Sequence, residues 1–321
     1  MTSLPTRAGA RGARVLAFGE HRPARVVTND ELSEHMETSD AWIRERTGIA
    51  ARRYAAPDET VVSMGAAAAA KALAQSGIEA SDVDLVLLAS CSMTRSIPGG
   101  AASLGTLLGA TRAGAVDVNA ACAGFCYALS WAADAIRNGS ARHVVVVGSE
   151  RLTTWLDPTD RGTAIIFGDG AGAAVVGPSD DNGIGPVVWG SDGTRADSIR
   201  VPDDGAYVTM DGPGVFRWAT TEMAEVARNA CAAAGLEPSE IKSFVPHQAN
   251  LRIVDSLARQ LGIDADRVAR DIVEMGNTSS ASVPLAIARL VDEGRVSPGD
   301  PMLLVAFGAG LTYAAQVVTA P

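Results

Sequence analysis

Hydrophobic residues follow two different spacings along the chain, and segments of the two kinds alternate. Short apolar runs, such as residues 144–147 and 302–307, have the length of buried strands. Longer segments between such runs carry apolar residues at helical spacing, and several of them end at a glycine. The pattern predicts a layered α/β fold, with helices between strands at residues 14–19, 84–89, 115–118, 144–148, 241–245 and 302–306.

The two halves of the chain resemble each other. Residues 64–77 and 222–235 each read as a helix that ends at a glycine, and they are offset by 158 residues. A second pair, residues 122–139 and 277–294, is offset by 155 residues. We therefore expect a duplicated fold in which equivalent helices begin close to an internal twofold axis.

Three reactive side chains occupy corresponding places in this repeat. Cys122 begins a helical pattern, where unsatisfied backbone N–H groups and the helix dipole favour a thiolate over a thiol. Asn277 falls opposite Cys122 at the shorter of the two offsets, and His247 lies in the loop after the predicted strand 241–245. The repeat therefore predicts that a thiol, an imidazole and an amide meet at one centre, as nucleophilic catalysis requires.

Composition and charge exclude several other classes of protein. The chain has 321 residues, of which 47% are hydrophobic, enough for a large core. No apolar run is long enough to span a membrane, and residues 1–12 have the composition of a flexible tail, not of a signal peptide. We therefore expect a cytoplasmic protein. The net charge of −10 argues against nucleic acid as a partner.

The remaining cysteines and histidines are interpreted as structural. Cys91, Cys126 and Cys231 show no Cys-x-x-Cys spacing and no histidine cluster, which argues against a metal site and against a disulfide framework. We expect these three cysteines to be small buried hydrophobic residues. His21, His35 and His143 are likewise assigned no chemistry.

Two glycine-rich segments, residues 168–177 and 308–318, could be mistaken for nucleotide-binding loops. Neither fits G-x-G-x-x-G, and each leads into β-branched, strand-like sequence instead of a helix. We predict tight hairpins at matching places in the two halves. Such a backbone can also bring N–H donors close to a nucleophile.

Five motifs of the chain are long enough to be specific: Ala120-Ala-Cys-Ala-Gly-Phe, Asp157-Pro-Thr-Asp-Arg-Gly-Thr, Phe167-Gly-Asp-Gly-Ala-Gly-Ala, Val245-Pro-His-Gln-Ala-Asn-Leu-Arg-Ile and Gly276-Asn-Thr-Ser. Together they resemble β-ketoacyl-[acyl carrier protein] synthase III, a family of thiolase-fold condensing enzymes, from about residue 14 to the C-terminus. The resemblance implies a duplicated, five-layered αβαβα fold that forms a homodimer. The two thiolase-like halves would be residues 13–178, with the nucleophile, and 179–321, with the histidine and asparagine.

The resemblance also implies a reaction. Cys122, His247 and Asn277 match the catalytic set, and the backbone N–H groups of Cys122 and Ala309 match an oxyanion hole. The substrates would be an acyl-CoA primer and a malonyl group on an acidic acyl carrier protein, with no further cofactor and no metal. Decarboxylating Claisen condensation would then initiate a fatty acid or polyketide chain, with the primer held on Cys122.

Further residues match family positions around the substrates. The resemblance implies CoA contacts at Thr38, Trp42, Arg46 and Arg161 and an acyl pocket that includes Ile97 and Phe216. Arg217 and Arg252, with Arg259 one to two helical turns beyond Arg252, are expected to form a basic patch for docking of the acidic carrier protein. Ile97 stands where the family can carry an aromatic residue that reaches into the partner subunit's pocket, so a smaller aliphatic side chain favours longer or branched primers. Residues 190–210 are shorter than the family pattern predicts, which favours a wider entrance.

Three alternatives stay open from the residues themselves. The same cysteine and histidine could transfer an acyl group to a hydroxyl or an amine without decarboxylation, although such a transfer needs no Asn277. A cysteine hydrolase would use both residues and release a free acid. A non-catalytic partner of a heterodimer would keep the fold, but it would have no need of Cys122.

Overall fold

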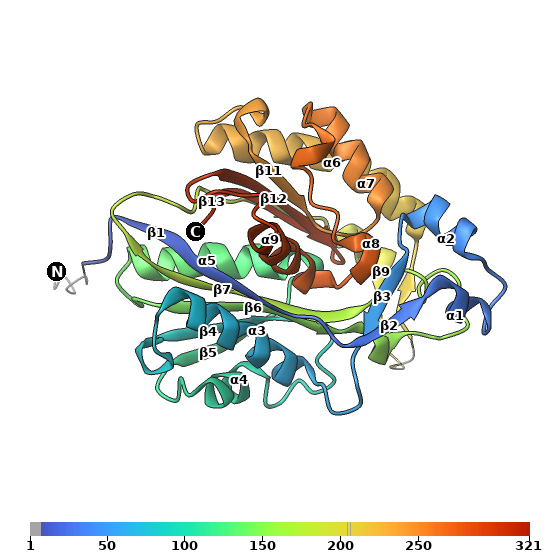
Figure 1. Ribbon diagram of the computed structural model, residues 1–321, viewed down its shortest axis with the longest axis horizontal. Coiled ribbons are helices and arrows are strands. Elements are labelled where there is room, and N and C mark those ends of the chain that lie inside the picture. The colour runs from blue at the N-terminus through green and yellow to red at the C-terminus, as the bar shows by residue number, and fades with distance from the viewer. Residues whose placement is uncertain (1–7, 204, 206) are drawn as a thin grey trace.

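The computed structural model describes residues 8–203, 205 and 207–321 and arranges them in five layers (Figure 1). One layer is a sheet with the strand order β1-β7-β6-β4-β5. Another is a sheet with the order β11-β12-β13-β8. The strands of the first sheet are β1 (Gly12–His21), β4 (Leu85–Ala89), β5 (Gly114–Val118), β6 (Val144–Arg151) and β7 (Asp169–Ser179); those of the second are β8 (Val188–Ser191), β11 (Ser243–Pro246), β12 (Pro301–Gly308) and β13 (Thr312–Thr319).

Helices form the other three layers (Figure 1). The central layer consists of α5 (Gly124–Arg137) and α9 (Ser282–Asp292), which lie between the two sheets. The outer layers are α3 (Val61–Ser76) with α4 (Ala101–Leu108) on the first sheet, and α6 (Gly212–Ala233) with α7 (Leu251–Leu261) on the second. Most residues of α5 and α9 are buried, as expected for helices that are covered on two sides. The predicted five-layered αβαβα fold is confirmed.

Smaller elements gather at one end of the molecule, at the right of Figure 1. The strands β2 (Arg25–Thr28) and β3 (Ala51–Tyr54) form an antiparallel pair, and β9 (Ile199–Arg200) pairs with β10 (Thr209–Met210). The short helices α1 (Asn29–Ser33), α2 (Asp40–Thr47) and α8 (Ile272–Met275) lie near them. Sequence analysis predicted none of these strands, because they are short and only partly buried.

The six predicted strands correspond to β1, β4, β5, β6, β11 and β12, with ends shifted by a few residues. The four-valine run of β6 is buried on both faces because α3 packs on one face of this central strand and α5 on the other. All strands of the first sheet lie within residues 12–179, and those of the second within residues 188–319. The division of the chain into two domains at residue 178 stays a prediction.

One of the two predicted hairpins is wrong. Residues 169–177 belong to the body of strand β7, and residues 152–168 connect β6 to it, so no tight turn lies there. The glycines of β7 serve close packing instead, since a Cβ on Gly172 would lie 2.7 Å from the backbone nitrogen of Leu285 in α9. The second prediction is confirmed: β12 and β13 pair up to Gly308 and Thr312, across a three-residue turn.

The repeat is more regular than sequence analysis predicted. The 3₁₀ turn Ala121–Ala123 precedes α5 as the turn Ser279–Ala281 precedes α9, and both turns contain a residue with a left-handed backbone. Ala121 has a φ of 46° and Ser279 a φ of 49°. The longer offset, which relates the helices α3 and α6, therefore applies here too. The predicted pairing of Cys122 with Asn277 at the shorter offset is wrong, and the counterpart of Cys122 is Ser280.

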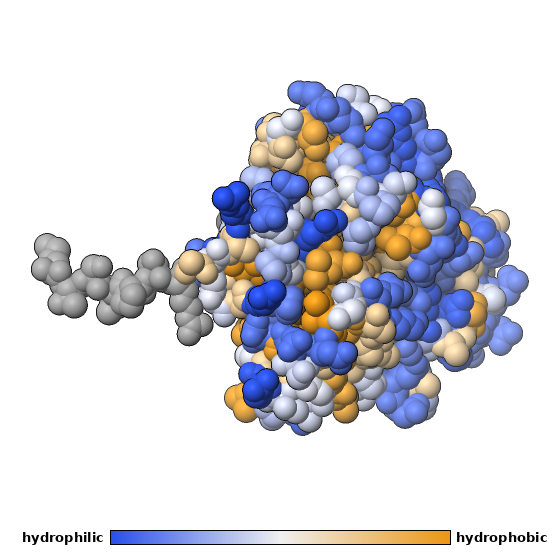
Figure 2. All heavy atoms as spheres, turned by 60° about the vertical axis from the view of Figure 1, so that its left-hand side comes forward, coloured by the Kyte–Doolittle hydropathy of each residue, from blue (hydrophilic) through white to orange (hydrophobic). Residues whose placement is uncertain are grey.

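None of the helices in the described ranges could cross a membrane. On the face seen in Figure 2, hydrophilic residues predominate and hydrophobic residues form several smaller patches between them. The cytoplasmic location stays a prediction, and the predicted flexible tail lies mostly outside the described residues.

Candidate active site

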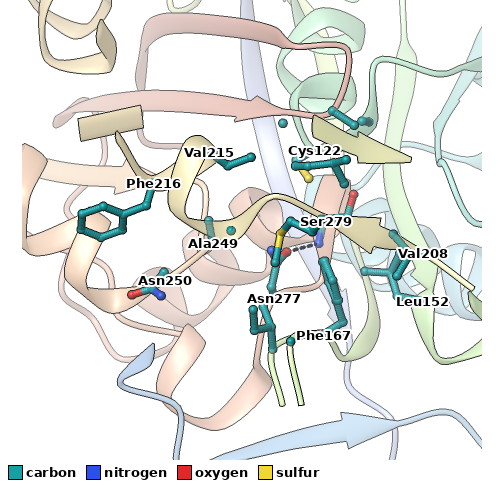
Figure 3. A pocket seen from close by; sticks show the side chains of 18 of the residues that line it. Cys122, Leu152, Phe167, Val208, Val215, Phe216, Ala249, Asn250, Asn277 and Ser279 are labelled. Carbon is teal, nitrogen blue, oxygen red and sulfur yellow. Dashed lines mark hydrogen bonds between the residues drawn. The ribbon is translucent and has the colours of Figure 1, made fainter. Parts of the chain in front are cut away.

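A cavity of about 840 Å³ lies between the two halves of the fold, and Cys122, His247 and Asn277 all line it. Cys122 comes from the end of the first sheet, and the other two come from the loops after β11 and α8. Figure 3 shows Cys122, Ser279 and Asn277 in the middle of the cavity wall. The structure therefore brings together the three side chains that the sequence singled out.

Cys122 lies in the 3₁₀ turn between β5 and α5. The left-handed backbone of Ala121 is an uncommon conformation for a residue with a side chain and redirects the chain at this point. Asn119 supports the turn, because its side-chain oxygen accepts a hydrogen bond from the nitrogen of Ala121 (3.2 Å). The backbone N–H groups of Cys122 and Ala309 lie near the sulfur and lower the pKa of the thiol. These are the two groups that sequence analysis assigned to the oxyanion hole.

Gly308 leaves the space that the nucleophile occupies. A Cβ at this position would lie 2.8 Å from both Cβ and Sγ of Cys122, and 3.1 Å from its backbone nitrogen. No side chain fits there without displacing the cysteine. The position therefore requires glycine because of close approach, although its backbone is not in the left-handed region.

The predicted lowering of the thiol pKa is not found. Burial raises the pKa of Cys122 to about 12; a hydrogen bond from the Ser279 hydroxyl lowers it, and the charge of Glu150 raises it further. Removal from water thus outweighs the backbone N–H groups around the sulfur. At neutral pH, Cys122 is therefore a thiol.

We expect the alkylation of Cys122 by iodoacetamide to keep rising with pH. Because the pKa of the thiol is raised, the thiolate fraction should grow about tenfold per pH unit from pH 7 to pH 10. The rate can be read by peptide mass spectrometry, with Cys122→Ala to identify the modified peptide. A rate that levels off below pH 9 would show that the thiol is more acidic than its burial implies.

His247 directly follows β11 and is 2% exposed. Its backbone N–H donates to the carbonyl of Val305 (2.8 Å), and its ring meets the Phe307 ring edge to face at 5.4 Å. The Nδ1 atom lies 2.7 Å from Oγ of Ser282. Burial lowers the pKa of His247 to about 3, so the imidazole is neutral at physiological pH.

Asn277 is fixed through its backbone and its side-chain oxygen. Its backbone N–H donates to the carbonyl of Ile166 (2.8 Å), and its carbonyl accepts from the nitrogen of Gly168 (3.0 Å). Its Oδ1 atom accepts a hydrogen bond from the nitrogen of Ser279 (2.8 Å; Figure 3). The same contact joins Asn119 to Ala121 in the first half, so the counterpart of Asn277 at the longer offset is Asn119. The amide Nδ2 of Asn277 has no acceptor among the described residues.

Sequence analysis missed Glu150, a fully buried carboxylate at the end of β6. It accepts hydrogen bonds from the backbone and hydroxyl of Ser92 and of Ser280, and from the nitrogen of Cys91. At the longer offset Glu150 corresponds to Gly308, as Ser280 corresponds to Cys122. Ser280 and Glu150 therefore form the repeat-related counterpart of Cys122 and Gly308, with one residue from each half. In this counterpart a carboxylate fills the space that Gly308 leaves open beside the nucleophile.

Apolar side chains surround the cavity on one side of Cys122. They are Leu152, Trp155, Ile166, Phe167 and Val208, and Figure 3 shows Leu152, Phe167 and Val208 on the opposite side of Cys122 from Phe216. Phe216 lines the cavity too, yet it lies beside Arg252, whose guanidinium is 5.2 Å from its ring centre. The apolar end is thus formed by side chains that the sequence did not single out, largely from the connection 152–168.

Five arginines of the described ranges also line the cavity. Arg46 and Arg161 lie over the Trp42 ring, at 4.5 and 4.6 Å from its centre. The other arginines are Arg200, Arg217 and Arg252, of which Arg200 was not predicted. No carboxylate of the described residues lines the cavity. A protein with a net charge of −10 thus presents a local site for anionic substrates.

Three of the predicted residues lie elsewhere or differ in character. Thr38 does not line the cavity, and its hydroxyl is buried without a hydrogen-bond partner among the described residues. Ile97 is 86% exposed and lies outside the cavity of its own chain. Cys91 was expected in the core, but it lines the cavity and lies 3.4 Å from the hydroxyl of Ser279. Cys126 and Cys231 are buried, as predicted.

Comparison with known proteins agrees with this geometry. Residues 116–193 match the family model "3-Oxoacyl-[acyl-carrier-protein (ACP)] synthase III", and residues 231–320 match the model of its C-terminal part. The chain is 46% identical to β-ketoacyl-[acyl-carrier-protein] synthase III 4 of Streptomyces coelicolor, over 97% of this chain and 99% of that protein. It is 47% identical to the mycobacterial β-ketoacyl-[acyl-carrier-protein] synthase III of Mycobacterium tuberculosis, over 100% of this chain and 99% of that protein.

A solved structure is similar over the whole chain as well. The priming β-ketosynthase of a polyketide biosynthetic pathway superposes with a TM-score of 0.96 at 45% identity, covering 100% of this chain and 99% of that one. The thiolase-like architecture is therefore shared in full. With 46% identity over nearly all of its length, this chain belongs to the β-ketoacyl-[acyl-carrier-protein] synthase III family.

Proposed function

We propose that this chain catalyses the decarboxylating Claisen condensation of an acyl-CoA primer with malonyl-acyl carrier protein. The 3-ketoacyl-acyl carrier protein that results initiates a fatty acid or polyketide chain. The observation that supports this most is the convergence of Cys122, His247 and Asn277 on one cavity. The names of the similar proteins, β-ketoacyl-[acyl-carrier-protein] synthases and a priming β-ketosynthase, agree with this reaction class.

The first step transfers the primer to the enzyme. The sulfur of Cys122 attacks the thioester carbonyl of the acyl-CoA, the bond between the acyl carbon and CoA breaks, and the thiol proton leaves with CoA. The backbone N–H groups of Cys122 and Ala309 hold the oxyanion of the tetrahedral intermediate. Because both groups already lie near the sulfur, they need little movement to reach an oxygen bound to the attacked carbon.

The second step forms the new carbon–carbon bond. Malonyl-acyl carrier protein loses carbon dioxide, and the electron pair of the broken bond forms an enolate. Its oxygen accepts hydrogen bonds from the imidazole N–H of His247 and from Nδ2 of Asn277. The enolate carbon attacks the acyl carbon on Cys122, and the sulfur leaves as a thiolate that takes up a proton. A buried, neutral imidazole suits this role because it donates a hydrogen bond without transferring a proton.

The arginines at the cavity bind the anionic parts of the two substrates. Arg46 and Arg161 already flank the indole of Trp42, where an adenine ring can take the place of one guanidinium and the displaced cation can reach a phosphate. Arg217 and Arg252 line the same cavity beside Phe216 and would receive the acidic carrier protein.

Replacing Trp42 by alanine should raise the KM for the acyl-CoA about tenfold. Loss of a stacking surface costs up to about 1.5 kcal/mol, and each 1.4 kcal/mol is about tenfold in affinity. The acylation rate at saturating acyl-CoA should stay within about twofold, since Trp42 is not expected to touch the acyl carbon. Steady-state kinetics would measure both, with Trp189→Ala, an exposed tryptophan outside the cavity, as the control. A lower rate at saturation with an unchanged KM would place Trp42 in another role.

We also propose that two copies of the chain pair through β5. This strand is the last in its sheet, and four of its five residues are exposed. Val116 on this strand is 46% exposed and Leu107 on the neighbouring α4 is 63% exposed. An unpaired edge with apolar neighbours favours pairing with a second sheet. Ile97, on the loop before α4, would then reach the acyl end of the partner's cavity.

The test of the proposed function is a product analysis. Purified protein is incubated with a panel of acyl-CoAs and malonyl-acyl carrier protein, and the carrier protein is read by intact mass. A 3-ketoacyl adduct, with one carbon dioxide released for each adduct, supports condensation and identifies the primer. Acylated Cys122 without that adduct would favour transfer to a hydroxyl or amine, and free acid would favour a hydrolase.

A further inference from the structure

The tautomer of His247 decides whether the second step can proceed. A neutral imidazole has one N–H donor and one bare nitrogen. If the bare nitrogen faces the enolate oxygen, the two lone pairs repel each other, and one of the two donors is lost. A group that fixes which nitrogen carries the proton therefore controls how many donors reach the enolate oxygen.

Ser282 is placed to be that group. It is the first residue of α9 and is 1% exposed, and its Oγ atom lies 2.7 Å from Nδ1 of His247. Its oxygen also accepts a longer hydrogen bond, 3.4 Å, from the nitrogen of Gln248. The hydroxyl proton must point to an acceptor, and Nδ1 of His247 is the only acceptor within hydrogen-bond distance among the described residues. A hydroxyl that donates to Nδ1 leaves the ring proton on Nε2.

The position of Ser282 in its helix supports the same assignment. Nδ1 approaches the N-terminus of α9, an eleven-residue helix whose first N–H groups carry partial positive charge. A proton on Nδ1 would point at this positive end, whereas a bare nitrogen lone pair is favoured there. Both the hydroxyl and the helix dipole therefore place the proton on the other nitrogen.

We propose that Ser282 is a positioning residue that fixes His247 as the Nε2–H tautomer and so aims a donor into the cavity. Asn277 is oriented by an analogous contact, since its Oδ1 atom accepts from the nitrogen of Ser279 and its Nδ2 is left for the substrate. The two donors for the enolate oxygen are thus each fixed by a residue at or just before the start of α9. The effect of the tautomer on the reaction rests on the proposed function, whereas the assignment of the tautomer rests only on the contacts of His247.

The tautomer can be measured directly by ¹⁵N NMR on protein labelled at histidine. The chain has four histidines, and His247→Asn identifies the signals of this one. We expect a protonated Nε2 and an unprotonated Nδ1 from pH 6 to pH 9 in the native protein. A protonated Nδ1 in the native protein would overturn the proposal. This measurement needs no substrate, so it determines the tautomer of His247 even if the proposed condensation is not found.

Kinetics of the two half-reactions give the second readout. Ser282→Ala should lower the rate of malonyl decarboxylation about 10- to 100-fold. Loss of one oxyanion donor lowers a rate by about 10²–10³. The variant should lose only part of this factor, because a fraction of its His247 side chains would still have the proton on Nε2. Acylation of Cys122 by acyl-CoA in a single turnover should change less than threefold. Ser282→Thr keeps the hydroxyl and should restore both the tautomer and most of the rate.

Ser149→Ala is the matched control for the loss of a buried serine hydroxyl. Ser149 is fully buried and its hydroxyl donates to the carbonyl of Val61 (2.7 Å), but it does not line the cavity. This variant should keep the Nε2–H tautomer and the native ratio of the two half-reactions. If Ser282→Ala changed neither the tautomer nor that ratio, or slowed both half-reactions equally as a structural defect would, the proposal would be overturned.

Discussion

Replacing Cys122 by alanine should lower formation of the 3-ketoacyl product by about 10³-fold or more. We expect no other described thiol to take over, since Cys126 and Cys231 are buried in the core and the sulfur of Cys91 lies 3.4 Å from the Glu150 carboxylate, whose charge disfavours a thiolate there. The variant should still decarboxylate malonyl-acyl carrier protein slowly to the acetyl form. The reason is that His247 and Asn277, which we propose to hold the enolate, remain in place.

Cys126→Ala is the control for this variant. Cys126 lies in the first turn of α5, is fully buried and does not line the cavity, so its loss should leave the product yield within about twofold. Intact mass of the carrier protein distinguishes the 3-ketoacyl, acetyl and malonyl forms in one experiment. Product formation by Cys122→Ala at a rate near that of the native protein would exclude Cys122 as the carrier of the acyl group.

Replacing Gly308 by alanine should slow acylation of Cys122 by about 100-fold. The added methyl group would lie 2.8 Å from the sulfur, so either the cysteine or the end of β12 must move. Displacement of a reacting atom by about 1 Å costs on the order of 10² in rate. The backbone N–H of Ala309 shifts with the strand end, so the sulfur and its oxyanion donor are misplaced together. Burst kinetics of CoA release measure this step alone.

Gly105→Ala controls for the general effect of removing a glycine. Gly105 lies in α4, and a Cβ there would meet its nearest neighbours at 3.6 and 3.7 Å, which is ordinary contact. This variant should acylate Cys122 at the native rate and be slightly more stable, because alanine favours the helix over glycine by about 1 kcal/mol. Native acylation by Gly308→Ala would show that the cysteine does not depend on this space.

The sequence predicted the fold because its core strands are continuous apolar runs and its repeat is visible at a fixed offset. The longer of the two offsets, when it is applied to the whole chain, also shows which residues of the two halves correspond to each other at the candidate site. The predicted pairing of Cys122 with Asn277 was wrong because the shorter offset came from the similarity of two helices, whereas the turns that precede these helices follow the longer offset. Those turns contain Ala121 and Ser279 in left-handed conformations, and neither residue type signals such a backbone.

Other parts of the site depend on contacts that no local pattern reveals. Glu150 is buried among serine hydroxyls from two distant loops, and a single glutamate after a valine run gives no sign of this. The repeat alone shows that Glu150 corresponds to Gly308. Only the structure shows that Gly308 lies against Cys122 and that Glu150 lies against Ser280, the counterpart of Cys122. Ser282 is one serine among several at the start of α9, and its contact with His247 spans 35 residues.

The thiol pKa shows where a sequence argument about chemistry is incomplete. A cysteine at the start of a helix is expected to be acidic, and the backbone N–H groups that favour the thiolate are indeed present. Burial outweighs them and raises the pKa of Cys122. Burial is a property of the whole folded chain, so it cannot be read from the position of a residue in one helix.

The measurement that tests the central claim most directly is a pulse–chase of the enzyme with its two substrates. Protein is first acylated with the primer CoA, the excess CoA ester is removed, and malonyl-acyl carrier protein is added. Intact mass then follows the enzyme and the carrier protein in quenched samples. We predict that the acyl mass on the Cys122 peptide disappears at the rate at which the 3-ketoacyl-carrier protein appears. An acyl group that stays on the enzyme, or that leaves as free acid or on another acceptor, would contradict the account.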